Sequence, residues 1–331
     1  MKYPKVEHSH IVPRSYTRRF AHDDKVAMRL LGQPHSRVIS TRDAALRSGF
    51  YRRERPDGTP IHDFEWGLSQ LEDKAAPILR DLDELWPLEK KQKAVLAELF
   101  AMQLIRGPRW RDWHESFVRE SVNKHRKVEL DAAAAAEAEE IARRIDTTER
   151  HLLSDTHWVI RMLSLGPKLA GILGSMHWAR IEFARPLIVT SDHAVVPWPL
   201  HAGARRPEAT TGDGLLKTLE VRVPASARQV ILMTWAEEED RARARLRGAP
   251  HHAGSLNTFT IAHAEKQWFH LPDTSPPVAA GGPFLPIAPE LLLDYDVAAH
   301  ASRRRAKASQ WIDSVRDRPW QSRDFEIVTI P

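Results

Sequence analysis

The sequence predicts an α+β fold that is predominantly helical, with a small β-sheet formed by the N-terminal segment and by strands in roughly residues 186–235. Two observations carry this prediction. Apolar residues recur every three or four positions from residue 63 to about residue 180, which is the period of amphipathic helices. Short runs rich in β-branched residues then follow, bounded by Pro, Gly and Ser, as is typical of strands.

Residues 1–64 form a basic and irregular N-terminal segment. Turn-forming residues punctuate it, and Pro56-Asp57-Gly58 is a clear turn signal. We expect short strands here, with a hairpin between residues 38–40 and 49–53.

The central region reads as a series of helices. Gly107-Pro108 and Gly166-Pro167 each interrupt the helical period, so a helix is expected to end at each of them. An alanine-rich stretch beginning at residue 131 is a strong helix former. The predicted helices cover residues 63–85, 87–105, 110–126, 131–144, 154–165 and 168–178.

The pattern changes after residue 180. Residues 187–189, 219–223 and 229–234 predict strands, and the first of them runs into the polar turn Thr190-Ser191-Asp192. Residues 257–270 predict a returning helix. The basic run at residues 303–307 is interpreted as a solvated surface.

We expect three segments that pack as one compact unit. They are a basic N-terminal segment (1–64) on a helical plus β core (65–272), and a Pro/Gly-rich loop with a basic C-terminal segment (273–331). A length of 331 residues is enough to bury a substantial core.

Composition excludes several classes of protein. The chain has no cysteine, which removes disulfides, iron–sulfur clusters, thiolate zinc sites and a cysteine nucleophile. It has no apolar run of about 18 residues, so no membrane association is expected. The first twenty residues carry charges throughout, unlike a signal peptide, so we expect a cytoplasmic protein. The net charge of +5 is mild, and it leaves nucleic acid open as a partner.

Familiar catalytic motifs are missing. The sequence contains no HExxH, P-loop, GxGxxG or GxSxG pattern. His10-Ile11-Val12-Pro13 is similar to the start of an HNH nuclease site. That site also needs an asparagine nearby, and the first one in this chain is Asn123.

His8 and His10 are candidate metal ligands. Two residues apart on a strand, they would face the same side, where two imidazoles can hold a divalent metal or a phosphate. Asp192, which follows a predicted strand, is the candidate third ligand. The alternatives are a solvated basic arm for the two histidines and an Asx-type turn for Asp192.

Glu72, Gln103 and Arg106 are candidate catalytic residues. Gln103 and Arg106 share one helix face and interrupt a strongly apolar stretch, so they need polar partners if they are buried. Glu72 is a reasonable partner for Arg106. A structural pairing and a contact with substrate are equally compatible with this pattern, and Glu72 also fits a solvated helix face.

Several motifs in order resemble a bacterial family known as domain of unknown function 4238. The first is H-x-V-P-x-x-Y-x-x-x-F, from His10 to Phe20, and Glu72 with its small apolar neighbours follows. Gln103 with Arg106 comes next, and T-S-D-x-P-V-V corresponds to residues 190–196, with Ala194 in place of the usual Pro. The resemblance covers roughly residues 8–270 and supplies no reaction or cofactor. It implies that His10, Glu72, Gln103, Arg106 and Asp192 meet in space.

Two functions are compatible with these residues. The first is a metal-assisted hydrolase of a phosphoester, with nucleic acid among the candidate substrates, in which His10, Glu72 and Asp192 hold a divalent ion or activate water. Arg106 would neutralise phosphate charge, and Gln103 would orient substrate or water. The alternative is a non-catalytic module that binds nucleic acid or a protein. Trp110, Arg111 and Trp113 form its candidate surface, unless these rings only pack a helix.

Overall fold

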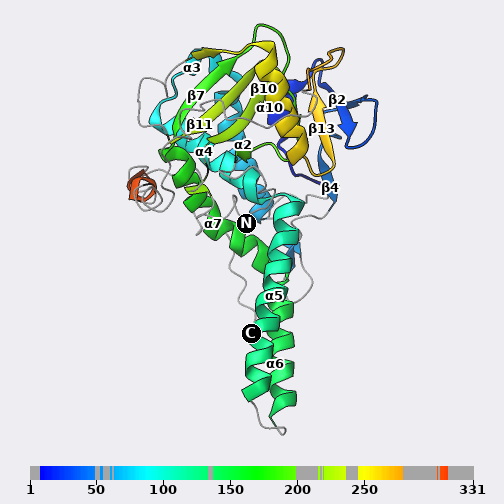
Figure 1. Ribbon diagram of the computed structural model, residues 1–331, viewed down its shortest axis with the longest axis vertical. Helices are drawn as coiled ribbons and strands as arrows, with labels where there is room; N and C mark the ends of the chain where they lie inside the picture. Colours follow the sequence, from blue (N-terminus) through cyan, green and yellow to red (C-terminus); the bar gives the residue numbers. More distant parts are fainter. Residues whose placement is uncertain are drawn as a thin grey trace.

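A computed structural model describes residues 8–48, 53–54, 60–61, 63–132, 137–198, 215–216, 218, 220–235, 245–278, 304 and 306–311. Figure 1 shows a head, which contains the sheets and most of the helices, and a helical hairpin that projects from it. The helices are α1 (Arg14–Thr17), the 3-10 helix η1 (Arg18–Phe20), α2 (Asp63–Arg80), α3 (Leu82–Leu85), α4 (Lys90–Ile105), α5 (Pro108–Ala132), α6 (Ala138–Leu152), α7 (Asp155–Ser175) and α10 (Pro250–His263).

Helix α4 is the central helix of the head. Every residue from Leu96 to Ile105 is buried, because α2 and α7 both pack against it. A helix buried on all sides is apolar on all sides, which explains the unbroken run Leu99–Met102. The two polar residues near its end, Gln103 and Arg106, are therefore buried too.

Helix α7 continues through Gly166-Pro167, where the sequence predicts a helix end. Gly166 lies against α4, and a Cβ atom there would be 2.7 Å from the sulfur of Met102. This close packing outweighs the local helix-breaking signal. Helix α7 ends at Ser175, so Trp178, predicted to be helical, lies in strand β7 (His177–Glu182) instead.

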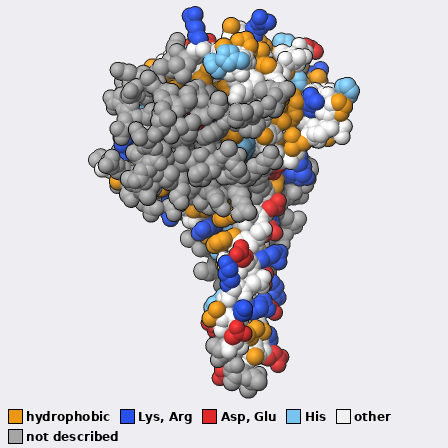
Figure 2. Space-filling view, viewed as in Figure 1, with side chains coloured by type: hydrophobic (Ala, Val, Ile, Leu, Met, Phe, Trp, Pro, Cys, Tyr) orange, Lys and Arg blue, Asp and Glu red, His pale blue; other side chains and the backbone are white. Residues whose placement is uncertain are grey.

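Helices α5 and α6 form the projecting hairpin. They enclose a small hydrophobic cluster of their own, Val118, Val122 and Ile145. Arg126 on α5 bonds to Asp146 on α6 at 2.6 Å. Figure 2 shows basic and acidic side chains interspersed along the hairpin.

The strands belong to two main sheets and two short pairs. The five-stranded sheet has the order β12 (Arg245–Arg247), β7, β11 (Gln229–Thr234), β10 (Glu220–Ser226), β9 (Val196–Trp198), and only β12–β7 is parallel. The four-stranded sheet has the order β3 (Arg37–Ser40), β2 (Lys25–Leu30), β13 (Gln267–His270), β8 (Thr190–Ser191). The short pairs are β1 (His8–His10) with β4 (Leu46–Ser48) and β5 (Arg53–Glu54) with β6 (Pro60–Ile61).

This arrangement confirms the predicted fold class, a predominantly helical α+β protein. The sequence predicts one small sheet, whereas the N-terminal strands and those of residues 220–234 lie in different sheets. Helix α10 contacts β8 of one sheet and β9 of the other. Strands β10 and β11 are buried along their whole length.

The hairpin predicted between residues 38–40 and 49–53 lies largely outside the described part of the chain, which omits residues 49–52; within that part β3 pairs with β2, and Arg53 pairs with Ile61 of β6. Another local prediction is wrong. The predicted helix 257–270 ends at His263, and its last residues form β13. The cause is Asp192, whose carboxylate accepts the backbone amides of residues 265–267 and so removes them from a helical pattern.

The basic tail is not wholly solvated. Arg304 is buried, donates to the carbonyl of Leu216 at 2.7 Å, and lies 4.6 Å from the centre of the Trp235 ring. Burial lowers the pKa of Arg304 to about 9. This part of the C-terminal segment is therefore packed on the core.

One hydrophobic core connects the N-terminal segment to the rest of the head. It includes Ile11, Val12, Tyr16 and Phe20 along with residues of α2, α4 and α7. No helix in the described part of the chain is both long and apolar enough to span a membrane.

Replacing Gly248 tests the packing around β7. A Cβ atom there would overlap the ring of Phe183, which is 1% exposed, so we expect Gly248→Ala to lower the free energy of unfolding by about 1–3 kcal/mol. Gly107→Ala is the control, because the atom nearest to a Cβ there is the carboxylate end of the flexible Glu265 side chain, 2.8 Å away. Urea unfolding measures both; equal stability of the two variants would contradict this packing.

Candidate functional site

Arg106 is the centre of a buried polar cluster. It lies at the C-terminal end of α4, and its side chain is 1% exposed. Its Nε donates to the carbonyl oxygen of Ile11 at 2.7 Å, and its Nη1 donates to Oε1 of Glu72 at 2.7 Å. With the Gln103 amide turned so that its oxygen faces Arg106, this oxygen accepts from Nε at 2.9 Å and from Nη2 at 2.7 Å.

These bonds join three parts of the chain. Glu72 belongs to α2, Gln103 and Arg106 belong to α4, and Ile11 lies between β1 and α1. The predicted pairing of Glu72 with Arg106 is thus present. All three guanidinium nitrogens of Arg106 bond to protein atoms, so this side chain holds the three segments together.

His10 lies beside this cluster. Its Nε2 is 3.0 Å from the carbonyl oxygen of Arg42. Burial lowers the pKa of His10, and the neighbouring charges of Arg106 and Arg14 lower it further, while the Arg42 carbonyl and the Glu72 carboxylate oppose the shift. The imidazole is therefore neutral near pH 7.

Asp192 performs a different task. Its side chain accepts the backbone N–H groups of Glu265 and Lys266, both at 2.8 Å, and of Gln267 at 3.1 Å. Burial raises the pKa of Asp192, and these three donors and the charge of Arg47 partly offset that rise. Asp192 thus fixes the corner between α10 and β13.

The structure gathers four of the five predicted catalytic residues: His10, Glu72, Gln103 and Arg106. Asp192 is engaged by the α10–β13 corner instead. Among the residues that the structure describes, no group of three or more His, Asp or Glu side chains is placed to hold a metal ion. The side chain of His8 lies outside the described part, so the ligand set His8, His10 and Asp192 stays a prediction.

The aromatic-basic candidate surface on α5 is largely packed. Trp110 is 2% exposed and stacks on Trp113 with 4.6 Å between ring centres. Arg111 bonds to Glu115 and Asp155. These contacts favour the packing alternative over a stacking surface for bases.

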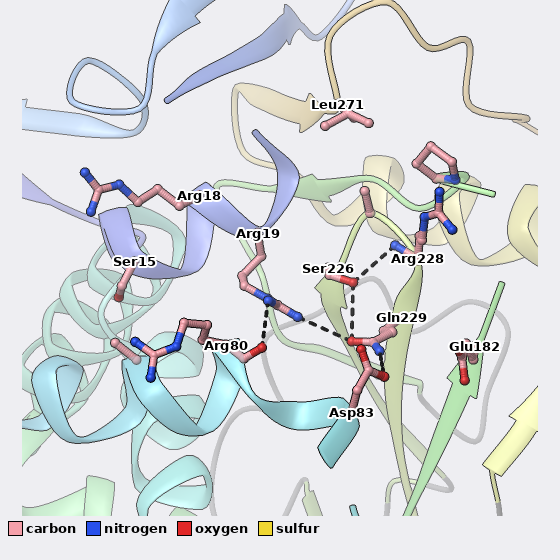
Figure 3. A pocket seen from close by; sticks show the side chains of 13 residues that line it. Ser15, Arg18, Arg19, Arg80, Asp83, Glu182, Ser226, Arg228, Gln229 and Leu271 are labelled. Atoms are coloured by element: carbon pink, nitrogen blue, oxygen red, sulfur yellow. Dashed lines mark hydrogen bonds between the residues drawn. The ribbon is translucent and has the colours of Figure 1, made fainter. Parts of the chain in front are cut away.

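A second polar site lies in a cavity of about 700 Å³. Four arginines line it, Arg18 and Arg19 of η1, Arg80 of α2 and Arg228 of the β10–β11 turn, and two carboxylates, Asp83 and Glu182. We call this space the arginine cavity. Figure 3 shows these side chains around it.

Arg19 is held in the wall of the arginine cavity by neutral acceptors. Its guanidinium donates to the carbonyl oxygen of Ala225 at 3.4 Å. It also donates to the carbonyl oxygen of Arg80 at 3.2 Å and to Oε1 of Gln229 at 3.4 Å (Figure 3). The backbone N–H of Ala227 donates to the carbonyl of Arg19 at 3.2 Å. Burial lowers the pKa of Arg19, against the opposing charges of Asp83 and Asp81.

The other arginines differ in their partners. Arg18 bonds to Asp24 at 2.9 Å, and Arg80 bonds to Asp81 through two nitrogens. Arg228 donates to the carbonyl of Ala184 at 3.1 Å. Within the described residues, no carboxylate lies within ion-pair distance of Arg19 or Arg228. Within the described lining of the cavity, these two guanidiniums are therefore the ones without a direct ion pair to a carboxylate.

Two carboxylates, Asp83 and Glu182, also line the cavity. Arg180, which is completely buried, donates to Asp83 at 2.6 Å and to Glu182 at 3.4 Å. Gln229 donates through Nε2 to Asp83, so its amide links Arg19 to this carboxylate. The negative charge of Asp83 therefore acts on both Arg180 and Arg19.

Little in the sequence predicts the arginine cavity. Arg18 and Arg19 stand inside the H-x-V-P-x-x-Y-x-x-x-F motif, between Tyr16 and Phe20, which is the only local signal. Arg228 comes from a turn far along the chain, and only the packing of η1 on that turn brings it near.

Comparison with known proteins gives one result. A family model described as "Protein of unknown function (DUF4238)" matches residues 8–274. The chain belongs to the DUF4238 family. No curated protein and no solved structure matches it. The DUF4238 match includes both the Arg106 cluster and the whole lining of the arginine cavity.

Removing Arg106 tests its structural role. We expect Arg106→Ala to lower the free energy of unfolding by about 3–5 kcal/mol, because it leaves the Ile11 carbonyl and the Gln103 amide without their buried donor. Arg150→Ala on the hairpin is the control and should change stability by less than about 0.5 kcal/mol. Urea unfolding of both variants measures this; an unchanged midpoint for Arg106→Ala would contradict the role.

Proposed function

We propose that this DUF4238 protein binds a phosphate-bearing ligand in the arginine cavity. The observation that carries the proposal is Arg19, a half-buried guanidinium in the wall of a 700 Å³ cavity, whose hydrogen bonds within the described part of the chain are long and go to neutral acceptors. A guanidinium is planar and weakly hydrated, and it presents paired donors that match phosphate oxygens. A bound phosphate would supply the directly bonded anion that Arg19 lacks among the described residues.

The surroundings of Arg19 favour such a ligand. Arg228, an exposed arginine of the adjacent turn, adds a second cation that forms no ion pair with a described carboxylate. Partial burial weakens solvent screening, so a charge-assisted bond in the cavity is stronger than one on the surface. The backbone bonds of η1 fix Arg19 in advance, which reduces the entropy lost on binding.

This assignment transfers the phosphate-binding role from Arg106 to Arg19. Arg106 was predicted to neutralise phosphate, but its three nitrogens already bond to Ile11, Glu72 and Gln103. Arg19 also bonds through its three nitrogens, but these bonds are longer, at 3.2–3.4 Å, their acceptors are neutral, and the side chain lines a cavity. Phosphoesters remain the ligand class, and nucleic acid remains one possible source of the phosphate.

A second candidate function is hydrolysis of a phosphoester. One observation favours it: His10 is neutral near pH 7 and lies beside the carboxylate of Glu72, which is 23% exposed. A neutral imidazole near a carboxylate can accept a proton from water and so act as a general base. The predicted metal ligands His8, His10 and Asp192 belong to a different arrangement, because an imidazole that coordinates a metal ion through its free nitrogen could not also accept this proton.

The binding proposal predicts a selective effect of Arg19. We expect Arg19→Gln to weaken inorganic phosphate binding at least tenfold, because glutamine keeps a polar side chain but removes the charge. Arg150→Gln makes the same charge change on the hairpin and should leave affinity unchanged. Isothermal titration calorimetry at two salt concentrations measures both. Equal affinities of the two variants would refute the site.

The hydrolase proposal predicts a defined pH profile. DNA and RNA would be incubated with the protein and Mg²⁺, Mn²⁺ or Zn²⁺, beside a folded His10→Gln variant. Because the pKa of His10 is lowered from 6.5, its basic form persists over neutral pH, so cleavage should decline only below about pH 6.5. Cleavage that His10→Gln retains in full would exclude this role.

A further inference from the structure

The hydroxyl of Ser36 lies within hydrogen-bond distance of the imidazole of His270. Ser36 belongs to the loop between β2 and β3, and His270 is the last residue of β13. Their Oγ and Nε2 atoms are 2.9 Å apart. Ser36 is exposed, whereas His270 is only 6% exposed. A serine that a solute can reach is thus bonded to a histidine that is shielded from solvent.

The second ring nitrogen determines where the hydrogen of this imidazole lies. Nδ1 of His270 is 2.9 Å from the carbonyl oxygen of Leu271 and 3.4 Å from the hydroxyl of Thr274, which donates to the same carbonyl at 2.6 Å. A carbonyl oxygen can only accept, so Nδ1 carries the hydrogen. In the neutral ring Nε2 is then an acceptor, and the hydroxyl of Ser36 donates to it.

The surroundings of His270 keep its ring neutral. Burial lowers the pKa of His270, the bond to the Leu271 carbonyl opposes this shift, and the charge of Arg29 lowers the pKa further. The basic form of the imidazole therefore persists at pH 7, where it can accept a proton from Ser36. A hydroxyl bonded to a base that a third group orients is the usual arrangement of an activated nucleophile.

Arg29 places a positive charge beside this pair. It is directly opposite Trp268 in the pairing of β2 with β13, and its Cζ atom lies 5.5 Å from the centre of the Trp268 ring. Trp268 and His270 are two residues apart on one strand, so they share a face of the sheet with Arg29. The Nε of Arg29 also donates to the carbonyl of Gln33 at 2.7 Å, which holds the loop that contains Ser36.

We infer that Ser36 and His270 form a nucleophile–base dyad that hydrolyses carboxylic esters. The Oγ atom of Ser36 attacks the carbonyl carbon, and its proton passes to Nε2 of His270. The bond from this carbon to the alcohol oxygen then breaks, the alcohol leaves with the proton from Nε2, and the acyl group stays on Oγ. Arg29 favours the negative charge that develops on the carbonyl oxygen.

Water completes the reaction. It attacks the acyl carbon and gives one proton to Nε2, the bond from that carbon to Oγ breaks, and Oγ takes this proton back as the carboxylic acid leaves. This activity uses neither the anion site at Arg19 nor His10. It is therefore independent of the proposed function.

An organophosphorus fluoride tests the dyad directly. Diisopropyl fluorophosphate reacts with an activated serine, whose Oγ bonds to phosphorus while fluoride leaves and the proton passes to the base. We expect peptide mass spectrometry to find the wild type modified at Ser36, and His270→Gln to react at least about 100-fold more slowly. His125→Gln makes the same change on the exposed hairpin and should react like the wild type.

Ester turnover provides a second readout. Ser36→Ala changes an exposed residue, so it should keep the circular dichroism spectrum of the wild type while it loses hydrolysis of p-nitrophenyl acetate. Ser116→Ala, at an exposed serine of α5, should keep the activity. A wild type that is not modified at Ser36, or a folded His270→Gln that is modified as fast as the wild type, would show that this bond only holds the loop.

Discussion

The guanidinium of Arg106 joins three segments of the chain in the interior of the head. It bonds to the carbonyl of Ile11, to Glu72 and to Gln103, and its side chain is almost fully removed from solvent. A buried charge of this kind is tolerated only when its donors are satisfied, so the three partners depend on one another. The residues after Ile11 are thereby fixed against α2 and α4.

The arginine cavity depends on that attachment. Two residues beyond Ile11, Pro13 precedes α1, and η1 with Arg19 follows directly. The hydroxyl of Tyr16 on α1 bonds to the carbonyl of Pro224 and to Thr190, which fastens the same segment to the sheets. The Arg106 cluster therefore anchors the segment from which α1 and η1 continue to the arginine cavity.

Sequence alone predicts the local parts of this arrangement. Gln103 and Arg106 interrupt an apolar helix at a spacing that puts them on one face, so a polar partner is required, and Glu72 supplies it. Residues 220–226 and 229–234 form strands close to where their β-branched runs predict them. In each case the deciding interaction lies within one element or follows from burial.

The rest of the fold and of the site depends on contacts between residues that are far apart in the sequence. The end of α10 is set by Asp192, which captures the amides of residues 265–267 from another part of the chain. The same capture explains why Asp192, predicted to be catalytic, is occupied by the backbone. The arginine cavity needs η1, α2 and the β10–β11 turn together, and no local pattern predicts which arginines lose their carboxylate partners.

The most direct test of this account is a crystal structure of the protein with tungstate, a heavy analogue of phosphate that anomalous scattering locates. The account predicts an anion bound between Arg19 and Arg228, with the Arg106 cluster unchanged. An anion bound instead at His10 and Arg106, with the bond from Arg106 to Glu72 broken, would contradict it.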